Sequence, residues 1–73
     1  MKWNNKTPPE PGWYAARFAR DALSRPWMNS YRWWDGRVWS WPAFPHETAV
    51  MAGRWAAKKE VKSYNYEIIW GTP

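Results

Sequence analysis

The sequence predicts an α+β fold, in which a small antiparallel sheet of about three to four strands carries one packed helix. Three observations predict this class: an Asp-Gly turn between two aromatic runs, a helical pattern over residues 47–59, and an alternating pattern over residues 64–70. With 73 residues, the chain has room for a single domain. We expect an extended N-terminal arm over residues 1–11, followed by one α+β domain over residues 12–73.

The arm is predicted from Pro8, Pro9 and Pro11, because prolines interrupt regular backbone hydrogen bonding. Trp3 lies on this arm, and the sequence leaves its role open. Its indole either folds back onto the domain or contacts a partner. We expect deletion of residues 1–7 to leave thermal stability nearly unchanged and to weaken partner binding.

The domain is expected to open with a strand over residues 13–19. Trp13 and Tyr14 begin this run, and aromatic residues favour strands. Alternation along the strand places Tyr14, Ala16 and Phe18 on one face.

A helix from Ala15 to Leu23 is the competing interpretation, because Ala15, Ala19 and Leu23 follow i, i+4 spacing. Residues 20–29 contain Pro26 and keep no sustained period, so a loop is predicted there.

The clearest local signal is a hairpin in which 31–34 and 37–40 flank Asp35-Gly36. An Asp-Gly pair between aromatic and β-branched runs is typical of a two-residue turn. If Trp34 and Arg37 flank that turn, then Trp33 pairs with Val38 and Arg32 with Trp39. The guanidinium of Arg32 would then stack on the indole of Trp39.

A helix is predicted from Glu47 to Lys59, because Val50, Gly53 and Ala57 trace one stripe. The final run over residues 64–70 predicts a half-buried strand. Its apolar face would consist of Tyr64, Tyr66, Ile68 and Trp70.

Nine tryptophans, four tyrosines and two phenylalanines dominate the composition. Each large ring can bury much apolar area, so these residues can supply the core that a short chain otherwise lacks. A folded domain is therefore expected despite seven prolines and a mean hydropathy of −0.87.

A net charge of +5 and a pI near 9.9 favour acidic partners. The absence of cysteine excludes disulfides and thiolate metal sites, and it fits a reducing cytosol. The sequence contains no apolar run of membrane-spanning length, so we expect no membrane partner.

The sequence contains few side chains that are suited to catalysis. His46 is the single histidine, and Ser40, His46 and Asp35 form a hydrolytic set only on paper, because Asp35 already serves the turn. The sequence has neither a Gly-rich phosphate loop nor the spacing of metal ligands. We expect no enzymatic activity, no catalytic residue, no cofactor and no metal.

Two binding modes match the cations and rings. In the first, the arm and a basic surface contact another protein, as tryptophan and arginine often do at interfaces. The residues assigned to this mode are Lys2, Trp3, Asn5, Lys6, Arg54, Lys58, Lys59 and Lys62.

In the second mode, bases of single-stranded nucleic acid stack on rings while cations contact phosphates. The residues assigned to it are Arg32, Trp33, Arg37 and Trp39. Alternatively, most of these rings fill the core and the cations only face solvent.

Two motifs carry a resemblance that covers about residues 8–45. They are Pro11-Gly12-Trp13-Tyr14 and Tyr31-Arg32-Trp33-Trp34-Asp35-Gly36-Arg37-Val38-Trp39-Ser40. With them the chain resembles small bacterial and phage proteins built on a PGWY…WWDG..W pattern. In size and basicity it is similar to a small lytic-phage regulator that inhibits host RNA polymerase and acts as an antiterminator. That similarity implies binding near the N-terminus of the polymerase β′ subunit, with altered promoter opening and termination.

The hypothesis from the sequence is therefore a non-enzymatic, phage-type regulator that binds host RNA polymerase. It would act as a monomer in the host bacterial cytoplasm. The alternative is a basic, aromatic-rich protein that binds single-stranded nucleic acid.

Overall fold

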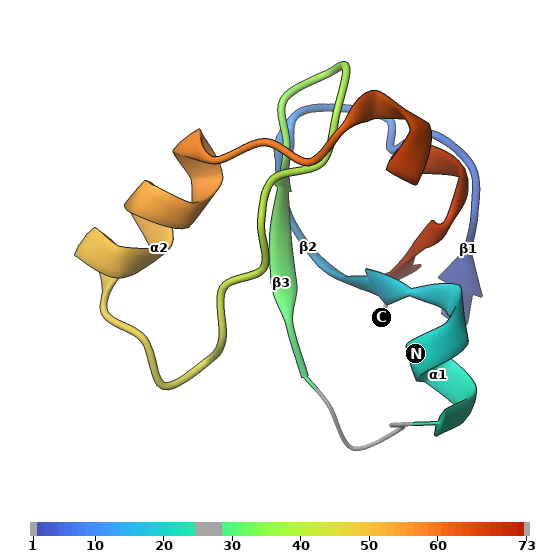
Figure 1. Ribbon diagram of the computed structural model, residues 1–73, viewed down its shortest axis with the longest axis horizontal. Coiled ribbons are helices and arrows are strands. Elements are labelled where there is room, and N and C mark those ends of the chain that lie inside the picture. The colour runs from blue at the N-terminus through green and yellow to red at the C-terminus, as the bar shows by residue number, and fades with distance from the viewer. Residues whose placement is uncertain (1, 25–28, 73) are drawn as a thin grey trace.

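Four strands form one antiparallel sheet in the order β1-β4-β2-β3 (Figure 1). The structure is a computed structural model that describes residues 2–24 and 29–72. The strands are β1 (Lys2–Asn4), β2 (Gly12–Phe18), β3 (Tyr31–Trp34) and β4 (Ile68–Thr72). The predicted α+β class is confirmed.

Three helical segments accompany the sheet: α1 (Ala19–Ser24), α2 (Ala49–Ala57) and the 3-10 helix η1 (Lys62–Tyr66). The helix predicted from Glu47 to Lys59 is present as the shorter α2. Thr48 caps its N-terminus, because the Thr48 hydroxyl accepts a hydrogen bond from the Met51 N–H at 3.2 Å. Figure 1 shows α2 beyond the β3 edge of the sheet, and none of its residues is buried.

The prediction of an arm without regular structure is wrong for residues 2–4. These residues form β1 at the sheet edge, where Lys2 pairs with Thr72 and Asn4 with Trp70. The prolines begin only at Pro8, so they do not prevent pairing of the first residues. The N- and C-terminal strands therefore lie side by side (Figure 1).

The strand interpretation is confirmed over Gly12–Phe18, and the competing helix interpretation holds only from Ala19 onward. The loop prediction over residues 20–29 is wrong at its start, because α1 occupies Ala19–Ser24. The Ala19 N–H donates to the Glu67 carbonyl at 2.8 Å, which ends the ladder with β4 and lets the chain turn into α1. Residues 25–28 of that prediction lie outside the described residues.

The hairpin is present, but its predicted register is wrong by two residues. Trp34 pairs with Trp39, so four residues connect the two sides instead of two. The Asp35 carboxylate explains the longer loop, because it accepts hydrogen bonds from the N–H groups of Arg37 and Val38, each at 2.8 Å. Gly36 supplies the positive φ of 102° that this loop requires. A shift of two residues keeps every side chain on its predicted face.

The C-terminal strand starts later than predicted. Residues 62–66 form η1, and β4 begins at Ile68. Tyr64 and Tyr66 are therefore exposed, whereas Ile68 and Trp70 face the interior as predicted.

The core lies on the sheet face that carries Tyr14, Ala16 and Phe18. The buried apolar residues of this cluster are Ala16, Trp34, Trp39, Ile68 and Trp70. Its rings meet edge to face: the centroid of Tyr14 lies 5.0 Å from that of Trp70 and 6.0 Å from that of Trp39. Such pairs are stabilising by about 0.5–1.5 kcal/mol each beyond their buried area.

Candidate functional site

The eight residues assigned to a protein partner do not form one patch. Lys2 and Trp3 lie on β1, whereas Arg54 and Lys58 belong to α2 and its C-terminal cap on the opposite side of the molecule (Figure 1). Asn5, Lys6 and Lys62 lie between these two ends, where they line one cavity. Lys59 pairs with the Asp35 carboxylate at 3.7 Å.

Trp3 takes the first of the two roles that the sequence left open. Its indole lies against the outer face of the sheet, where the Arg17 guanidinium stands 4.4 Å from the ring centroid. The segment after β1 is also fixed, because the Trp70 indole N–H donates to the Lys6 carbonyl at 2.5 Å. The half-buried Trp3 ring is thus part of the folded domain.

Burial excludes two of the four residues assigned to nucleic acid. Trp39 is 2% exposed and Arg32 is 4% exposed, so neither side chain can contact a strand in solution. Trp33 is half-buried and meets Trp13 edge to face, with 5.6 Å between ring centroids. Arg37 alone is fully on the surface. The rings of the hairpin therefore pack mainly in the core, which is the alternative that the sequence left open.

Arg32 makes a buried polar network instead of the predicted stack on Trp39. Its guanidinium donates to the Ser40 carbonyl at 2.8 Å and to the Glu60 carboxylate at 3.2 Å, and it lies 5.0 Å from the Phe18 ring centroid. Burial lowers the pKa of Arg32, and the hydrogen bond and charge of Glu60 oppose that shift. This network joins β3 to the segment after α2.

Ser40 completes this network from a fully buried position. Its hydroxyl accepts from the Trp33 N–H at 2.8 Å and donates to the Trp41 carbonyl at 2.9 Å. The Ser40 N–H donates to the Trp33 carbonyl at 2.9 Å. The polar groups of Ser40 are therefore paired, as a buried residue requires.

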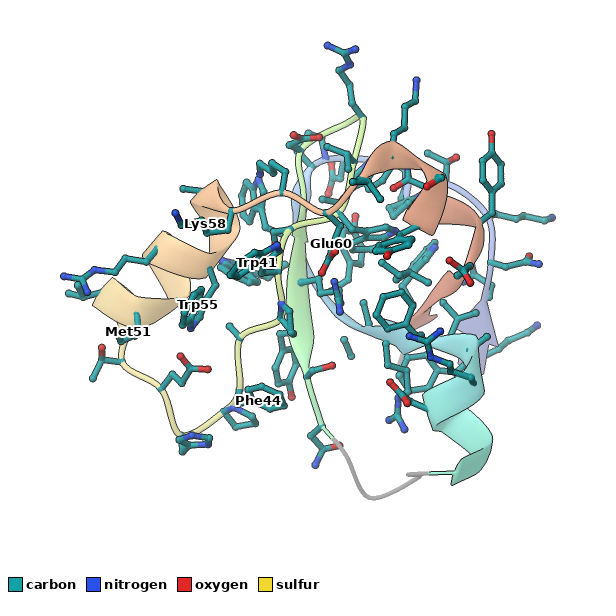
Figure 2. The ribbon with its side chains drawn as sticks, in the orientation of Figure 1. Trp41, Phe44, Met51, Trp55, Lys58 and Glu60 are labelled. Carbon is teal, nitrogen blue, oxygen red and sulfur yellow. The ribbon has the colours of Figure 1, made fainter. Side chains whose placement is uncertain are left out.

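An aromatic pair holds α2 at the sheet edge. Trp55 of α2 lies against Trp41, with ring centroids 6.0 Å apart and planes inclined by 25° (Figure 2). The Trp55 indole N–H also donates to the Glu47 carboxylate, whose other oxygen accepts from the Phe44 N–H at 2.9 Å. These contacts position α2 without burying it.

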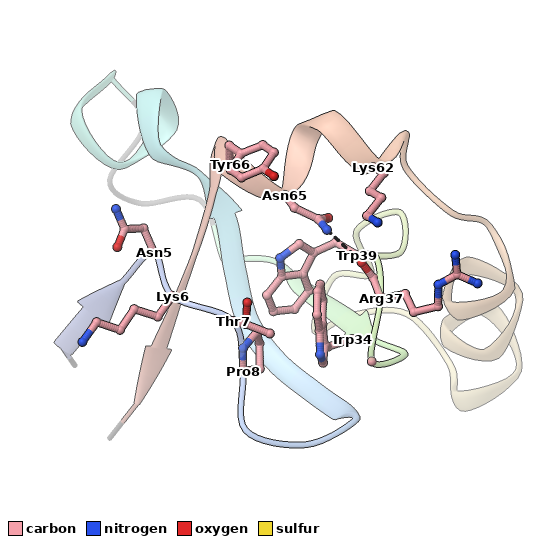
Figure 3. Close-up of a pocket in the computed structure, with 11 residues that line it drawn as sticks. Asn5, Lys6, Thr7, Pro8, Trp34, Arg37, Trp39, Lys62, Asn65 and Tyr66 are labelled. Carbon is pink, nitrogen blue, oxygen red and sulfur yellow. Dashed lines mark hydrogen bonds between the residues drawn. The ribbon is translucent and has the colours of Figure 1, made fainter.

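A cavity of about 340 Å³ opens between the segment after β1, the hairpin loop and η1 (Figure 3). Buried Trp34 and Trp39 form its floor. The other lining residues are Asn5, Lys6, Thr7, Pro8, Gly36, Arg37, Lys62, Asn65 and Tyr66. Three of the lining residues are cationic and none is acidic, so the cavity favours an anion.

The two walls of this cavity are joined by Asn65. Its amide donates to the Arg37 carbonyl at 2.8 Å and so links η1 to the hairpin loop (Figure 3). The buried Oδ1 of the same amide accepts no hydrogen bond from the described residues. Sequence reasoning placed Asn65 in a strand and missed this link, because the 3-10 helix has no distinctive pattern.

Comparison of the chain with models of protein families, with curated proteins and with solved structures found no match. Within residues 2–24 and 29–72, no group of three or more His, Asp or Glu side chains is arranged to hold a metal ion. No helix in these ranges is both long enough and apolar enough to cross a membrane.

Proposed function

We propose that the protein is a phage-type regulatory protein that binds bacterial RNA polymerase and changes transcription, without catalysis. The similarity in size and basicity to a small lytic-phage regulator suggests the β′ subunit as the contact and inhibition with antitermination as the outcome. In this proposal the protein acts as a monomer in the cytoplasm of a bacterial host.

The observation that supports this proposal best is the distribution of unpaired positive charge. Within the described part of the chain, no carboxylate forms a salt bridge with five of the eight assigned residues. These five are exposed, and they are Lys2, Lys6, Arg54, Lys58 and Lys62. Charge that is not neutralised internally attracts an acidic protein face and speeds association with it.

The exposed helix α2 carries the part of this surface that mutation can test most directly. Arg54 and Lys58 stand at its C-terminal end, and the helix projects away from the sheet (Figure 2). Because α2 buries no residue, both side chains can be replaced without disturbing the core.

Binding is tested with purified bacterial RNA polymerase and immobilised protein, by measuring Kd at about 0.1 M salt, where surface charges are partly screened. We expect the double variant Arg54→Gln/Lys58→Gln to bind about tenfold more weakly, since each exposed charge contact contributes up to about 1 kcal/mol. The matched control Arg54→Lys/Lys58→Arg keeps both charges and should bind within twofold of the parent.

A pull-down from nuclease-treated bacterial lysate complements this measurement and should recover the β and β′ subunits. Recovery of nucleic acid alone from an untreated lysate, with no binding to the purified enzyme, would reject the proposal. A promoter-opening and termination assay with the same two variants then tests whether binding changes transcription.

A further inference from the structure

The cavity between the segment after β1, the hairpin loop and η1 differs in charge from its surroundings. Its lining includes Lys6, Arg37 and Lys62 and no carboxylate. Asp35 and Glu60 share a neighbouring pocket with Arg37 and Lys62, but each is paired with another cation: Asp35 with Lys59 at 3.7 Å and Glu60 with Arg32 at 3.2 Å. A ligand that occupies the cavity is therefore expected to carry negative charge.

The side chains of the three cations that line the cavity point in different directions. In Figure 3 the Lys62 side chain points toward the indoles of the floor, whereas Lys6 and Arg37 extend outward at opposite ends of the cavity. Exposed side chains of this length change rotamer in picoseconds to nanoseconds. Lys62 thus already faces the floor, and Lys6 and Arg37 can turn toward an anion from both ends.

The rim of the cavity also carries an unusually exposed ring. Tyr66 ends η1 and is 88% exposed, the largest value among the exposed large hydrophobic residues in the described ranges. A ring that is free of the core can stack on a planar ligand, which is how aromatic side chains bind nucleobases. Thr7 of the segment after β1 and Asn65 of η1 add a hydroxyl and an amide to the lining.

These features together describe one class of ligand. The cavity volume of about 340 Å³ lies at the small end of the range for small-molecule sites, roughly 300–1,000 Å³. We propose that it binds a nucleoside phosphate, with the base on the Tyr66 ring and the phosphate held by Lys62, Arg37 and Lys6. The nucleotide is either free or one unit of a single strand. Of the four residues that the sequence assigned to nucleic acid, the site uses Arg37 alone, because Trp39 lies buried beneath it.

Binding is measured by calorimetry and by backbone NMR, with AMP, a short oligodeoxyadenylate and inorganic phosphate as the three probes. AMP or the oligonucleotide should shift the resonances of residues 36–37 and 62–66. Binding of AMP identifies a free nucleotide, and binding of the oligonucleotide alone identifies one unit of a strand. If neither probe shifts those resonances, or if phosphate alone binds as tightly as both, the proposal is overturned.

Two pairs of variants locate the ligand. Tyr66→Ala should weaken binding about tenfold, whereas Tyr66→Phe, which keeps the ring, should stay within twofold. Lys62→Gln should weaken binding about fivefold, because it removes the cation that faces the cavity. The control Lys58→Gln removes the same charge from the cap of α2, outside the cavity, and should leave the affinity unchanged.

An equal loss in Lys58→Gln and Lys62→Gln would mean that bulk charge alone attracts the nucleotide, and it would also overturn the proposal. The Tyr66 variants keep this outcome separable from polymerase binding, because Tyr66 is not among the residues assigned to polymerase, whereas Lys6 and Lys62 are.

Discussion

Trp39 is the largest fully buried side chain in the described part of the domain. It follows the hairpin loop, yet it is 2% exposed and contacts Trp34 with ring centroids 5.1 Å apart. The adjacent Ser40 is fully buried and carries the hydrogen bonds that fix the chain on both sides of it. One short segment thus supplies both apolar contact and backbone pairing.

Replacing Trp39 with alanine should lower the free energy of unfolding by about 3–5 kcal/mol, because a large ring leaves a cavity that its neighbours cannot fill. Trp41→Ala is the matched control, since Trp41 is exposed and its ring stacks on Trp55 of the edge helix. The free energy of unfolding of Trp41→Ala should fall by less than about 1.5 kcal/mol. Urea unfolding followed by circular dichroism measures both, and equal losses would contradict this view of the core.

Asp35 makes stability depend on pH. Partial burial of its carboxyl raises the pKa, but the N–H groups of Val38 and Arg37 and the Lys59 ammonium outweigh burial and hold the pKa below its ordinary value of 3.8. Because the folded pKa is lowered, the stabilisation is present above the ordinary value and is lost as pH falls through the folded pKa.

The variant Asp35→Asn keeps the side-chain oxygen of the loop but does not titrate. We expect its free energy of unfolding to fall less than that of the parent between about pH 5 and pH 2. Thermal unfolding across this range, at fixed salt, measures the difference. Parallel pH curves for the two proteins would mean that the hydrogen bonds to Asp35 do not stabilise the fold.

Residue patterns predicted the inward face of β4 correctly. Alternation placed Ile68 and Trp70 there, because period-2 spacing fixes the face of a strand. For β2, alternation set Tyr14, Ala16 and Phe18 apart from the other face without indicating which face is inward. The burial of Arg32 was not predicted, because its partners, the Ser40 carbonyl and the Glu60 carboxylate, lie beyond the hairpin loop and after α2. The pairing across the loop was not predicted either, because it depends on hydrogen bonds from the loop backbone to Asp35.

Among the elements, β1 changes the expected behaviour of the N-terminus most. It pairs with β4, its Trp3 ring contacts Arg17, and the segment after it binds the Trp70 indole. None of these contacts is visible in the local sequence, because the partners lie far along the chain. The proline-based prediction of an arm was therefore wrong where long-range pairing outweighs local composition.

Deletion of residues 1–7 should now destabilise the domain, contrary to the expectation from sequence. The lost indole hydrogen bond and cation–π contact alone suggest a decrease of about 1–2.5 kcal/mol in the free energy of unfolding. The variant Trp3→Ala keeps the backbone pairing, so its free energy of unfolding should fall by about 1 kcal/mol or less. Thermal melts of both variants provide the test, and an unchanged melting temperature in the deletion would show that β1 is dispensable.

At the scale of the whole molecule, stability is distributed unevenly. The sheet buries the aromatic core, while α2 buries no residue and contacts the rest through Trp55 and its flanking segments. The sequence predicted that a helix would exist there, but not its place, because an apolar stripe does not specify the surface it meets. The predicted stripe of Val50, Gly53 and Ala57 is exposed, and the helix instead meets the sheet edge through Trp55, whose ring lies against Trp41.

Hydrogen exchange should separate these two regions. Amides of α2 are expected to exchange at least about tenfold faster than those of β2 and β4, because few buried contacts oppose local opening of the helix. Mass spectrometry or NMR after dilution into deuterated water measures both regions in one sample. Equal protection would show that α2 unfolds only together with the sheet.

The pairing of β1 with β4 has a further consequence for the covalent design of the chain. Lys2 and Thr72 are register partners, and Cα atoms of such partners lie about 4.5–5.5 Å apart. A short peptide linker could therefore close the backbone into a ring without displacing a strand. Such a cyclised molecule would have fewer unfolded conformations and would resist both exopeptidases and fraying of the outermost strand.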